Sequence, residues 1–117
     1  MNQRPMTLVE YVTRRQKEFP QATGAFTMLV EGIALAAKII SREVNQAGLG
    51  QLLGLTGRRN VQGEIVARLD EFANDTFVRT LTRGGTVCAI GSEELAVPIR
   101  LPASPAPGLY SVVFDPL

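Results

Sequence analysis

A short uncharged run, Thr86–Ile90, leads directly into the glycine, serine and two acids of Gly91-Ser92-Glu93-Glu94. An apolar run of this length that is bounded by glycine is typical of a buried strand. Two carboxylates at the end of such a strand supply the oxygen ligands that hard cations such as Mg²⁺ prefer. The alternative is that both acids form a solvated turn, as polar residues do at many strand ends.

The composition narrows the chemistry that the chain can perform. At 117 residues, with 45% hydrophobic and 20% charged residues, it has the size and make-up of one ordinary globular domain. A formal net charge of +1 gives no electrostatic indication of a nucleic-acid or anionic-membrane partner. The absence of histidine excludes a histidine-based triad or a histidine-ligated metal within this chain. The single cysteine, Cys88, is expected to be a buried, inert thiol.

Neither a signal peptide nor a membrane span is predicted. The N-terminal residues lack the apolar stretch of a signal peptide, and no segment reaches the roughly 20 apolar residues that a bilayer span needs. A cytoplasmic protein is therefore expected.

Hydrophobic periodicity predicts three helices, over residues 7–18, 25–46 and 64–83. Thr7 and Glu10 have the spacing of a capping box, which places the start of the first helix near Thr7. Pro20 ends that helix. In the second and third helices, apolar residues recur at three- and four-residue steps, so each presents an apolar face to a core.

Residues 48–63 combine five glycines with four leucines. The glycines argue against a steady helix, and long loops in compact domains are usually functional or disordered. We therefore predict a mobile loop that docks through its leucines and is released through its glycines.

Residues 86–117 are predicted to form strands. After the first strand, Leu95–Leu101 is a second candidate, and Pro98 places it at an edge or a bulge. Leu109–Phe114 is nearly unbroken in hydrophobicity, as interior strands are. The sequence then stops at Asp115-Pro116-Leu117, and we expect the chain to be the front part of a larger fold.

The turn that precedes the second helix has two interpretations. Thr23 and Thr27 flank Gly24 at a predicted helix N-terminus, where exposed amides and hydroxyls can bind a phosphate group. Alternatively, Thr23 only caps the helix.

Five segments together resemble class I fructose-1,6-bisphosphatase, a family of sugar phosphatases. They are Ala22-Thr23-Gly24 with Thr27, Asn60-Val61-Gln62-Gly63-Glu64, Leu69-Asp70 with Ala73-Asn74, Ser92-Glu93-Glu94, and Phe114-Asp115-Pro116-Leu117. Each motif is weak alone, but their order and spacing make the resemblance specific, and it extends from Thr7 to Leu117. It implies an α+β fold, namely the N-terminal part of the layered sugar-phosphatase fold: three helices followed by the first strands of a mainly antiparallel sheet.

The resemblance also implies roles for the acidic residues. Glu93 and Asp115 match carboxylates that bridge Mg²⁺ sites, with Mn²⁺ as an alternative ion, and Leu117 matches a residue whose backbone carbonyl binds metal. Asp70 and Glu94 match the pair that polarises the attacking water. Glu64 matches a position that reaches a further metal, although many relatives have aspartate there. Residues 48–63 match a loop whose closure brings its acidic end to the metals.

A second implied site binds AMP, the family's inhibitor. Thr23, Gly24, Thr27 and Tyr110 fall at its positions. Leu109 stands where the family usually has a lysine that pairs with the AMP phosphate. The loss of that contact, about 1.5–3 kcal/mol, predicts weakened AMP inhibition.

The expected function is Mg²⁺-dependent hydrolysis of the 1-phosphate of fructose 1,6-bisphosphate in gluconeogenesis, by a full-length homotetramer. The 117-residue chain alone is expected to be inactive, because the family's later metal and sugar ligands are absent from it. Two alternatives are a sedoheptulose-1,7-bisphosphatase and a non-catalytic nucleotide-binding regulatory or assembly module.

Overall fold

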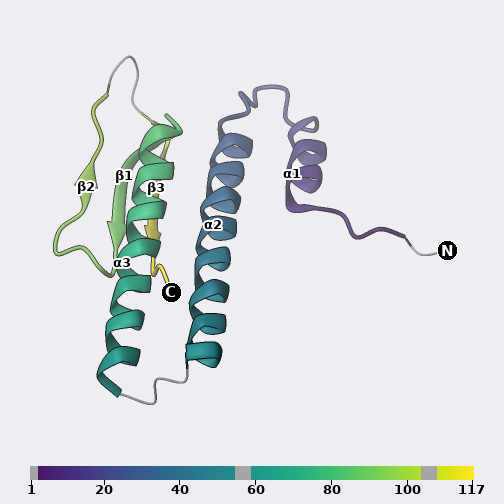
Figure 1. Ribbon diagram of the computed structural model, residues 1–117. Coiled ribbons are helices and arrows are strands. Elements are labelled where there is room, and N and C mark those ends of the chain that lie inside the picture. Colours follow the sequence, from purple (N-terminus) through teal and green to yellow (C-terminus); the bar gives the residue numbers. More distant parts are fainter. Residues whose placement is uncertain (1–2, 55–58, 104–107) are drawn as a thin grey trace.

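The computed structural model describes residues 3–54, 59–103 and 108–117, with the backbone alone for 50–54 and 59–62. Its elements are α1 (Leu8–Gln16), α2 (Ala25–Gly54), α3 (Arg59–Arg83), β1 (Val87–Ser92), β2 (Ile99–Arg100) and β3 (Tyr110–Phe114). The helices α2 and α3 run antiparallel beside each other and next to the strands, whereas α1 lies on the outer side of α2 (Figure 1). The predicted α+β class is confirmed.

The capping box at the start of α1 is confirmed. The Glu10 amide donates to the Thr7 hydroxyl at 3.1 Å, and the Thr7 amide donates to the Glu10 carboxylate at 2.8 Å. These reciprocal bonds satisfy two amides that have no partner inside a helix. The helix ends at Gln16, two residues before its predicted end, and a turn then leads to α2.

The structure differs from the sequence prediction at residues 48–63. The helix α2 continues through Gly54, and α3 already begins at Arg59, so most of the predicted loop is helical. An interior glycine costs a helix only about 1 kcal/mol, and good helix formers separate these glycines. Extending an existing helix also avoids the cost of nucleation. The centre of the predicted loop, 55–58, lies outside the described residues.

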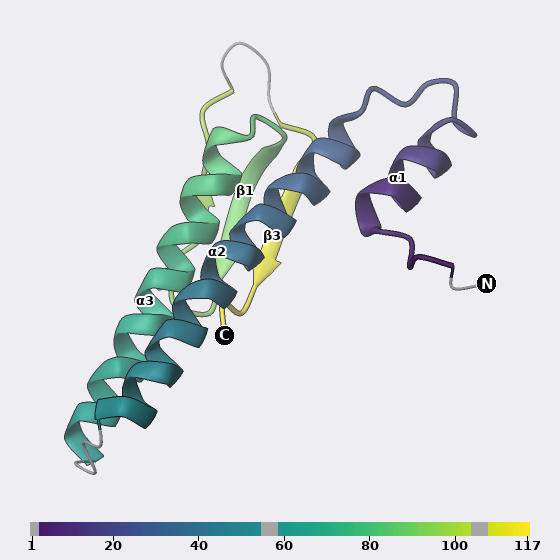
Figure 2. The same cartoon turned by 45° about the vertical axis from the view of Figure 1, so that its right-hand side comes forward.

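The hydrophobic core lies between the α2–α3 pair and one face of the sheet, and Figure 2 shows both helices on that side of β1 and β3. Leu29 from α2, Leu81 from α3, and Val87 and Ile90 from β1 form its buried centre. The Ile90 side chain is fully buried. Phe77 extends the core toward the end of β3 by stacking on Phe114, with ring centroids 4.8 Å apart.

The sheet is mixed, with strand order β2-β1-β3. The short β2 pairs antiparallel with β1, whereas β3 pairs parallel with β1 over more residues. The predicted edge position of the Pro98 segment is confirmed, but within the described strands the sheet is not mainly antiparallel. The long connection between β1 and β3 allows β3 to return in the same direction as β1. At its end, Gly108 passes so close to the Val87 backbone that an added Cβ would lie 2.4 Å from a backbone atom.

One face of β3 is exposed, which differs from the interior position suggested by its hydrophobic sequence. Val113 is 84% exposed, whereas Val112 and Phe114 turn toward the core. Cys88 also differs from its prediction: it is half-buried, and its sulfur lies 3.6 Å from the Ser111 hydroxyl. Adjacent residues of a strand point to opposite faces, so a continuous apolar run does not by itself place both faces in a core.

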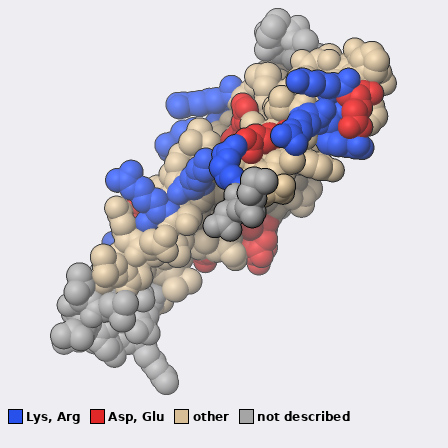
Figure 3. All heavy atoms as spheres, turned by 90° about the vertical axis from the view of Figure 1, so that its right-hand side faces the viewer, with Lys and Arg blue, Asp and Glu red and all other residues tan. Residues whose placement is uncertain are grey.

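Basic side chains gather over the α1–α2 side of the molecule, with fewer acidic ones among them (Figure 3). Arg14 and Arg15 lie in the last turn of α1, and Lys38 and Arg42 are exposed on α2. In the described part of the chain, no helix has both the length and the hydropathy that a bilayer span requires.

Candidate metal and ligand sites

The two acidic motifs meet where β1 and β3 end. The parallel register pairs Ser92 with Phe114, so the next residues, Glu93 and Asp115, leave the sheet side by side. The Glu93 amide donates to the Phe114 carbonyl at 3.2 Å, which extends the pairing by one residue. Parallel strands deliver their carboxyl ends to one edge of a sheet, and ligands in such sheets bind at that edge.

Ser92 fixes the turn that presents the two glutamates. Its hydroxyl accepts a hydrogen bond from the Glu94 amide at 3.2 Å, and its carbonyl accepts one from the Leu95 amide at 3.0 Å. Both Glu93 and Glu94 are exposed. The turn predicted from Gly91-Ser92-Glu93-Glu94 is therefore present, and its acids are accessible to a ligand.

The charge distribution at this edge raises the pKa of Glu93 above its usual value. The largest cause is the negative charge of Asp115, followed by a hydrogen bond to the Asp115 carboxylate, the charge of Glu94, partial desolvation and the charge of Asp70. Carboxylates in such proximity disfavour each other's ionised form. The structure therefore places Glu93 beside Asp115, with Glu94 and Asp70 near enough for their charges to act on Glu93.

These four carboxylates have the donor chemistry of a Mg²⁺ site, and their mutual repulsion is what a divalent cation would relieve. Within the described residues, however, no group of three or more acidic, cysteine or histidine side chains converges closely enough to hold a metal ion. Charge interactions act over longer distances than coordination bonds, so the two observations are compatible. The described carboxylates therefore influence one another electrostatically without forming a set of metal ligands.

The structure does not bring Glu64 into this group. It is exposed on α3, six residues before Asp70, which is about 9 Å along a helix axis, and it is not among the groups that shift the pKa of Glu93. Leu117 follows the buried Pro116, two residues after Asp115, and its side chain is exposed.

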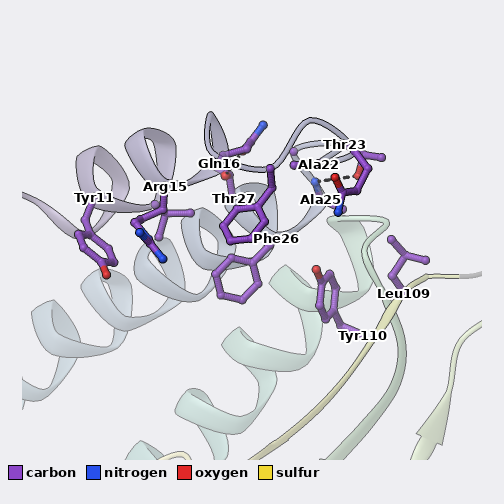
Figure 4. Close-up of a pocket in the computed structure, with 14 residues that line it drawn as sticks. Tyr11, Arg15, Gln16, Ala22, Thr23, Ala25, Phe26, Thr27, Leu109 and Tyr110 are labelled. Atoms are coloured by element: carbon purple, nitrogen blue, oxygen red, sulfur yellow. Dashed lines mark hydrogen bonds between the residues drawn. The ribbon is translucent and has the colours of Figure 1, made fainter.

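A separate cavity of about 460 Å³ lies between α1, the start of α2 and the start of β3 (Figure 4). All four residues predicted for the second site line it: Thr23, Gly24, Thr27 and Tyr110. The remaining lining residues are Tyr11, Val12, Arg15, Gln16, Phe19, Gln21, Ala22, Ala25, Phe26 and Leu109.

Local hydrogen bonds shape this cavity. The Thr23 hydroxyl accepts a long hydrogen bond, 3.4 Å, from the amide of Ala25, the first residue of α2. Thr23 therefore lies one position before the N-cap, which is Gly24. Gly24 has φ = +87°, a conformation that side-chain-bearing residues rarely adopt, and this turns the chain into α2. The Thr27 hydroxyl donates to the side-chain carbonyl of Gln16 at 2.5 Å, which ties α2 to α1.

Sequence reasoning missed the contributions of Gln16, Arg15 and Phe26 to the cavity. Gln16 is the last residue of α1, and Phe26 stacks at 6.0 Å on Tyr110, a residue far along the chain. The helical periodicity of α1 could have placed Arg15 and Gln16 near its C-terminal end, but not opposite Thr27, because that contact depends on the packing of α1 against α2.

Comparisons with known proteins identify the family of this chain. The family model described as "Fructose-1-6-bisphosphatase, N-terminal domain" matches residues 6–117. The chain belongs to this family. It is 49% identical over 112 residues to the class 1 fructose-1,6-bisphosphatase of Maridesulfovibrio salexigens, covering 96% of this chain and 33% of that protein. With the class 1 enzyme of Salinibacter ruber it shares 46% identity over 113 residues, which cover 95% of this chain and 31% of that one.

The fructose-1,6-bisphosphatase family also supplies structural neighbours. The crystal structure of Leishmania major fructose-1,6-bisphosphatase in holo form matches with a TM-score of 0.75 and 32% identity, covering 97% of this chain and 32% of that one. The T-state structure of the same enzyme matches with a TM-score of 0.73. The chain thus spans about a third of the length of the curated relatives it matches.

Proposed function

We propose that this chain supplies the N-terminal third of a Mg²⁺-dependent sugar-bisphosphate phosphatase, which hydrolyses the 1-phosphate of fructose 1,6-bisphosphate to give fructose 6-phosphate and phosphate. The observation that supports it most is that Glu93 and Asp115 leave β1 and β3 side by side, with Glu94 and Asp70 near enough for their charges to raise the pKa of Glu93, in a chain of the fructose-1,6-bisphosphatase family. A role in gluconeogenesis, a cytoplasmic location and a homotetrameric assembly belong to the same proposal.

In this proposal Glu93 and Asp115 would hold the cation, together with the Leu117 carbonyl, and Glu64 would serve a further metal position. When bound, Mg²⁺ supplies a Lewis acid that offsets negative charge on the phosphoryl oxygens. Asp70 and Glu94 orient the attacking water and accept its proton. The water oxygen forms a bond to phosphorus, the bond from phosphorus to the sugar oxygen breaks, and that oxygen gains a proton from solvent.

The 117-residue chain alone is proposed to be inactive. Mg²⁺ requires near-octahedral coordination and loses its water shell reluctantly, so a partial set of carboxylates binds it weakly. The described residues contain no group of three such ligands in metal-binding geometry.

The test uses a completed chain, in which residues 1–117 are joined to the remaining two thirds of the Maridesulfovibrio salexigens relative. We expect Mg²⁺-dependent phosphate release from fructose 1,6-bisphosphate, and a loss of at least about 100-fold in Glu93→Gln. A neutral amide holds the cation less tightly than a carboxylate, and changes beside metal ligands already cost about 10–100-fold. The matched control, Glu43→Gln, changes an exposed glutamate of α2 and should retain activity. No release from any sugar bisphosphate by the folded completed chain would overturn the proposal.

Two other functions are distinguished by the same preparation. Faster release from sedoheptulose 1,7-bisphosphate than from fructose 1,6-bisphosphate would indicate the related phosphatase. A non-catalytic nucleotide-binding module is the second candidate, and it is favoured by the cavity that Thr23, Gly24, Thr27 and Tyr110 line together. AMP binding by a chain that releases no phosphate would support that candidate.

A further inference from the structure

Asn74 is a buried polar residue of α3 to which the proposed reaction assigns no role. It is 8% exposed, and among the described residues no group donates a hydrogen bond to its buried Oδ1 atom. Thr76 is equally buried on the same helix, but its hydroxyl donates to the Phe72 carbonyl at 2.7 Å. A buried acceptor without a donor destabilises a folded protein, so the position of the Asn74 oxygen needs an explanation.

Helical geometry places Asn74 near the sheet edge where β1 and β3 end. It follows Asp70 by four residues and precedes Phe77 by three, so these side chains share one face of α3. The charge of Asp70 acts on Glu93, and Phe77 stacks on Phe114 at 4.8 Å. Asn74 therefore lies between the end of the core and the carboxylates, on the side of α3 that faces the strands (Figure 2).

The side chain of Asn74 meets acceptors at this edge. Its oxygen is buried, so a bound substrate cannot reach it, and any part in catalysis acts through a neighbouring residue. The charges that act on Glu93 come from Asp115, Glu94 and Asp70, all of them carboxylates. Ionised carboxylates accept hydrogen bonds and donate none. An oxygen directed at them finds no donor, whereas an NH2 group finds acceptors.

The same amide can supply that donor. Its oxygen and its NH2 group have nearly equal size, so a half-turn about the Cβ–Cγ bond exchanges the two within the same volume. Asp70 is one helical turn away, and the Cβ atoms of residues at this spacing lie about 5–6 Å apart. One hydrogen bond between two short polar side chains spans that separation, and polar pairs at this spacing are known to stabilise helices.

We propose that Asn74 is a positioning residue for Asp70: in the completed protein its NH2 group donates to the Asp70 carboxylate and holds it in one orientation. The inference rests on the proposed function, in which Asp70 and Glu94 orient the attacking water. Without this hydrogen bond the carboxylate samples several orientations, and the water is aligned for a smaller fraction of the time. Asn74 does not touch the substrate, so it affects turnover and not substrate binding.

The kinetic test uses the completed chain. Asn74→Leu keeps the approximate size of the side chain and removes the donor, whereas Asn74→Asp replaces the donor with an acceptor. We expect both to lower kcat about 10–100-fold, the usual effect of removing a group that orients a functional side chain, and to leave KM within about twofold. The matched control Thr76→Val removes an equally buried polar group and should retain kcat. Full kcat in a folded Asn74→Leu variant would overturn the proposal.

A double-mutant cycle separates positioning from general damage to the fold. Asp70→Ala removes the carboxylate that Asn74 orients, so adding Asn74→Leu should lower kcat by less than about twofold further. Reductions that multiply would show that the two residues act independently, against the proposal.

Amide exchange gives a readout that does not depend on activity. In the completed chain with asparagine labelled by ¹⁵N and no Mg²⁺ added, the side-chain NH2 protons of Asn74 should exchange slowly with solvent. Asp70→Ala should accelerate that exchange at least about tenfold, and Thr76→Val should not. Exchange that is unchanged by Asp70→Ala would contradict the hydrogen bond. If the completed chain releases no phosphate, the phosphatase proposal fails, while the exchange rates still decide whether Asn74 donates to Asp70.

Discussion

Replacing Ile90 by alanine tests whether the β1 strand is the centre of the folded structure. Ile90 is fully buried between the sheet and the α2–α3 pair, beside Leu29, Leu81 and Val87. The substitution removes three carbon groups at about 0.8 kcal/mol each, or about 2.4 kcal/mol of transfer free energy. The cavity left behind adds about 1–2 kcal/mol, because close-packed surroundings relax only in part. We therefore expect the free energy of unfolding to fall by about 3.4–4.4 kcal/mol.

The assay is urea denaturation followed by circular dichroism, which reports the loss of helix on unfolding. With a denaturant slope of about 1.5 kcal/mol/M, the expected loss lowers the midpoint by roughly 2.5 M. Ile90→Val, which removes one carbon, should cost about 1 kcal/mol. The control Val113→Ala lies on the same sheet but is 84% exposed, and should change stability by less than 0.5 kcal/mol. Equal effects of Ile90→Ala and Val113→Ala, or a loss below 1 kcal/mol in the former, would refute this account of the core.

Three smaller predictions concern the carboxylates and the first helix. Thr7→Ala should destabilise α1 by about 1 kcal/mol, seen as faster amide exchange in that helix, while Thr7→Ser should not. The backbone amide and hydroxyl of Thr7, with the Arg4 side chain, lower the pKa of Glu10 below its usual value near 4.5. Because the pKa of Glu10 is lower in the folded chain, the folded state gains stability above about pH 4.5, and this gain is lost as the pH falls through the folded-state pKa. In a Glu10→Gln variant, the helicity of α1 should no longer depend on pH in this range. Glu93→Gln relieves repulsion from Asp115, so it should raise the melting temperature of the metal-free chain; an unchanged or lower value would contradict the proximity of the two side chains.

The elements of this fold were predictable where local sequence determines them. The capping box at Thr7 and Glu10 and the helical periodicity located the three helices, because both depend on residues a few positions apart. The helical state of residues 48–54 was not predicted, because the glycines there suggested a loop. Each interior glycine costs a helix only about 1 kcal/mol, and the good helix formers between them outweigh that cost. The parallel pairing of β1 with β3 could not be read from either strand, because strand partners are set by contacts between distant segments.

In the candidate sites, too, local features could be predicted from the sequence, whereas contacts between distant segments could not. The residues alone left Glu93 and Glu94 as either a cation site or a solvated turn, and the family resemblance favoured the site. The proximity of Glu93 to Asp115 required the strand register. At the cavity, the turn around Thr23 could be placed before the second helix from the sequence. The bond between Gln16 and Thr27 depends on how α1 packs on α2, which no local pattern encodes.

The register that creates the acidic edge depends on one irregularity at the beginning of β1. Val87 pairs with Tyr110 and Ala89 with Ser111, so Cys88 is an extra residue on β1 with no partner on β3. Without this bulge the register would move by one residue, and Asp115 would lie opposite Ser92 instead of following alongside Glu93. A shift of one residue turns a side chain to the other face of a sheet, so the two carboxylates would then separate. The extra residue Cys88 thus acts through the backbone, by aligning Glu93 with Asp115. A bound cation would relieve the repulsion between these two carboxylates.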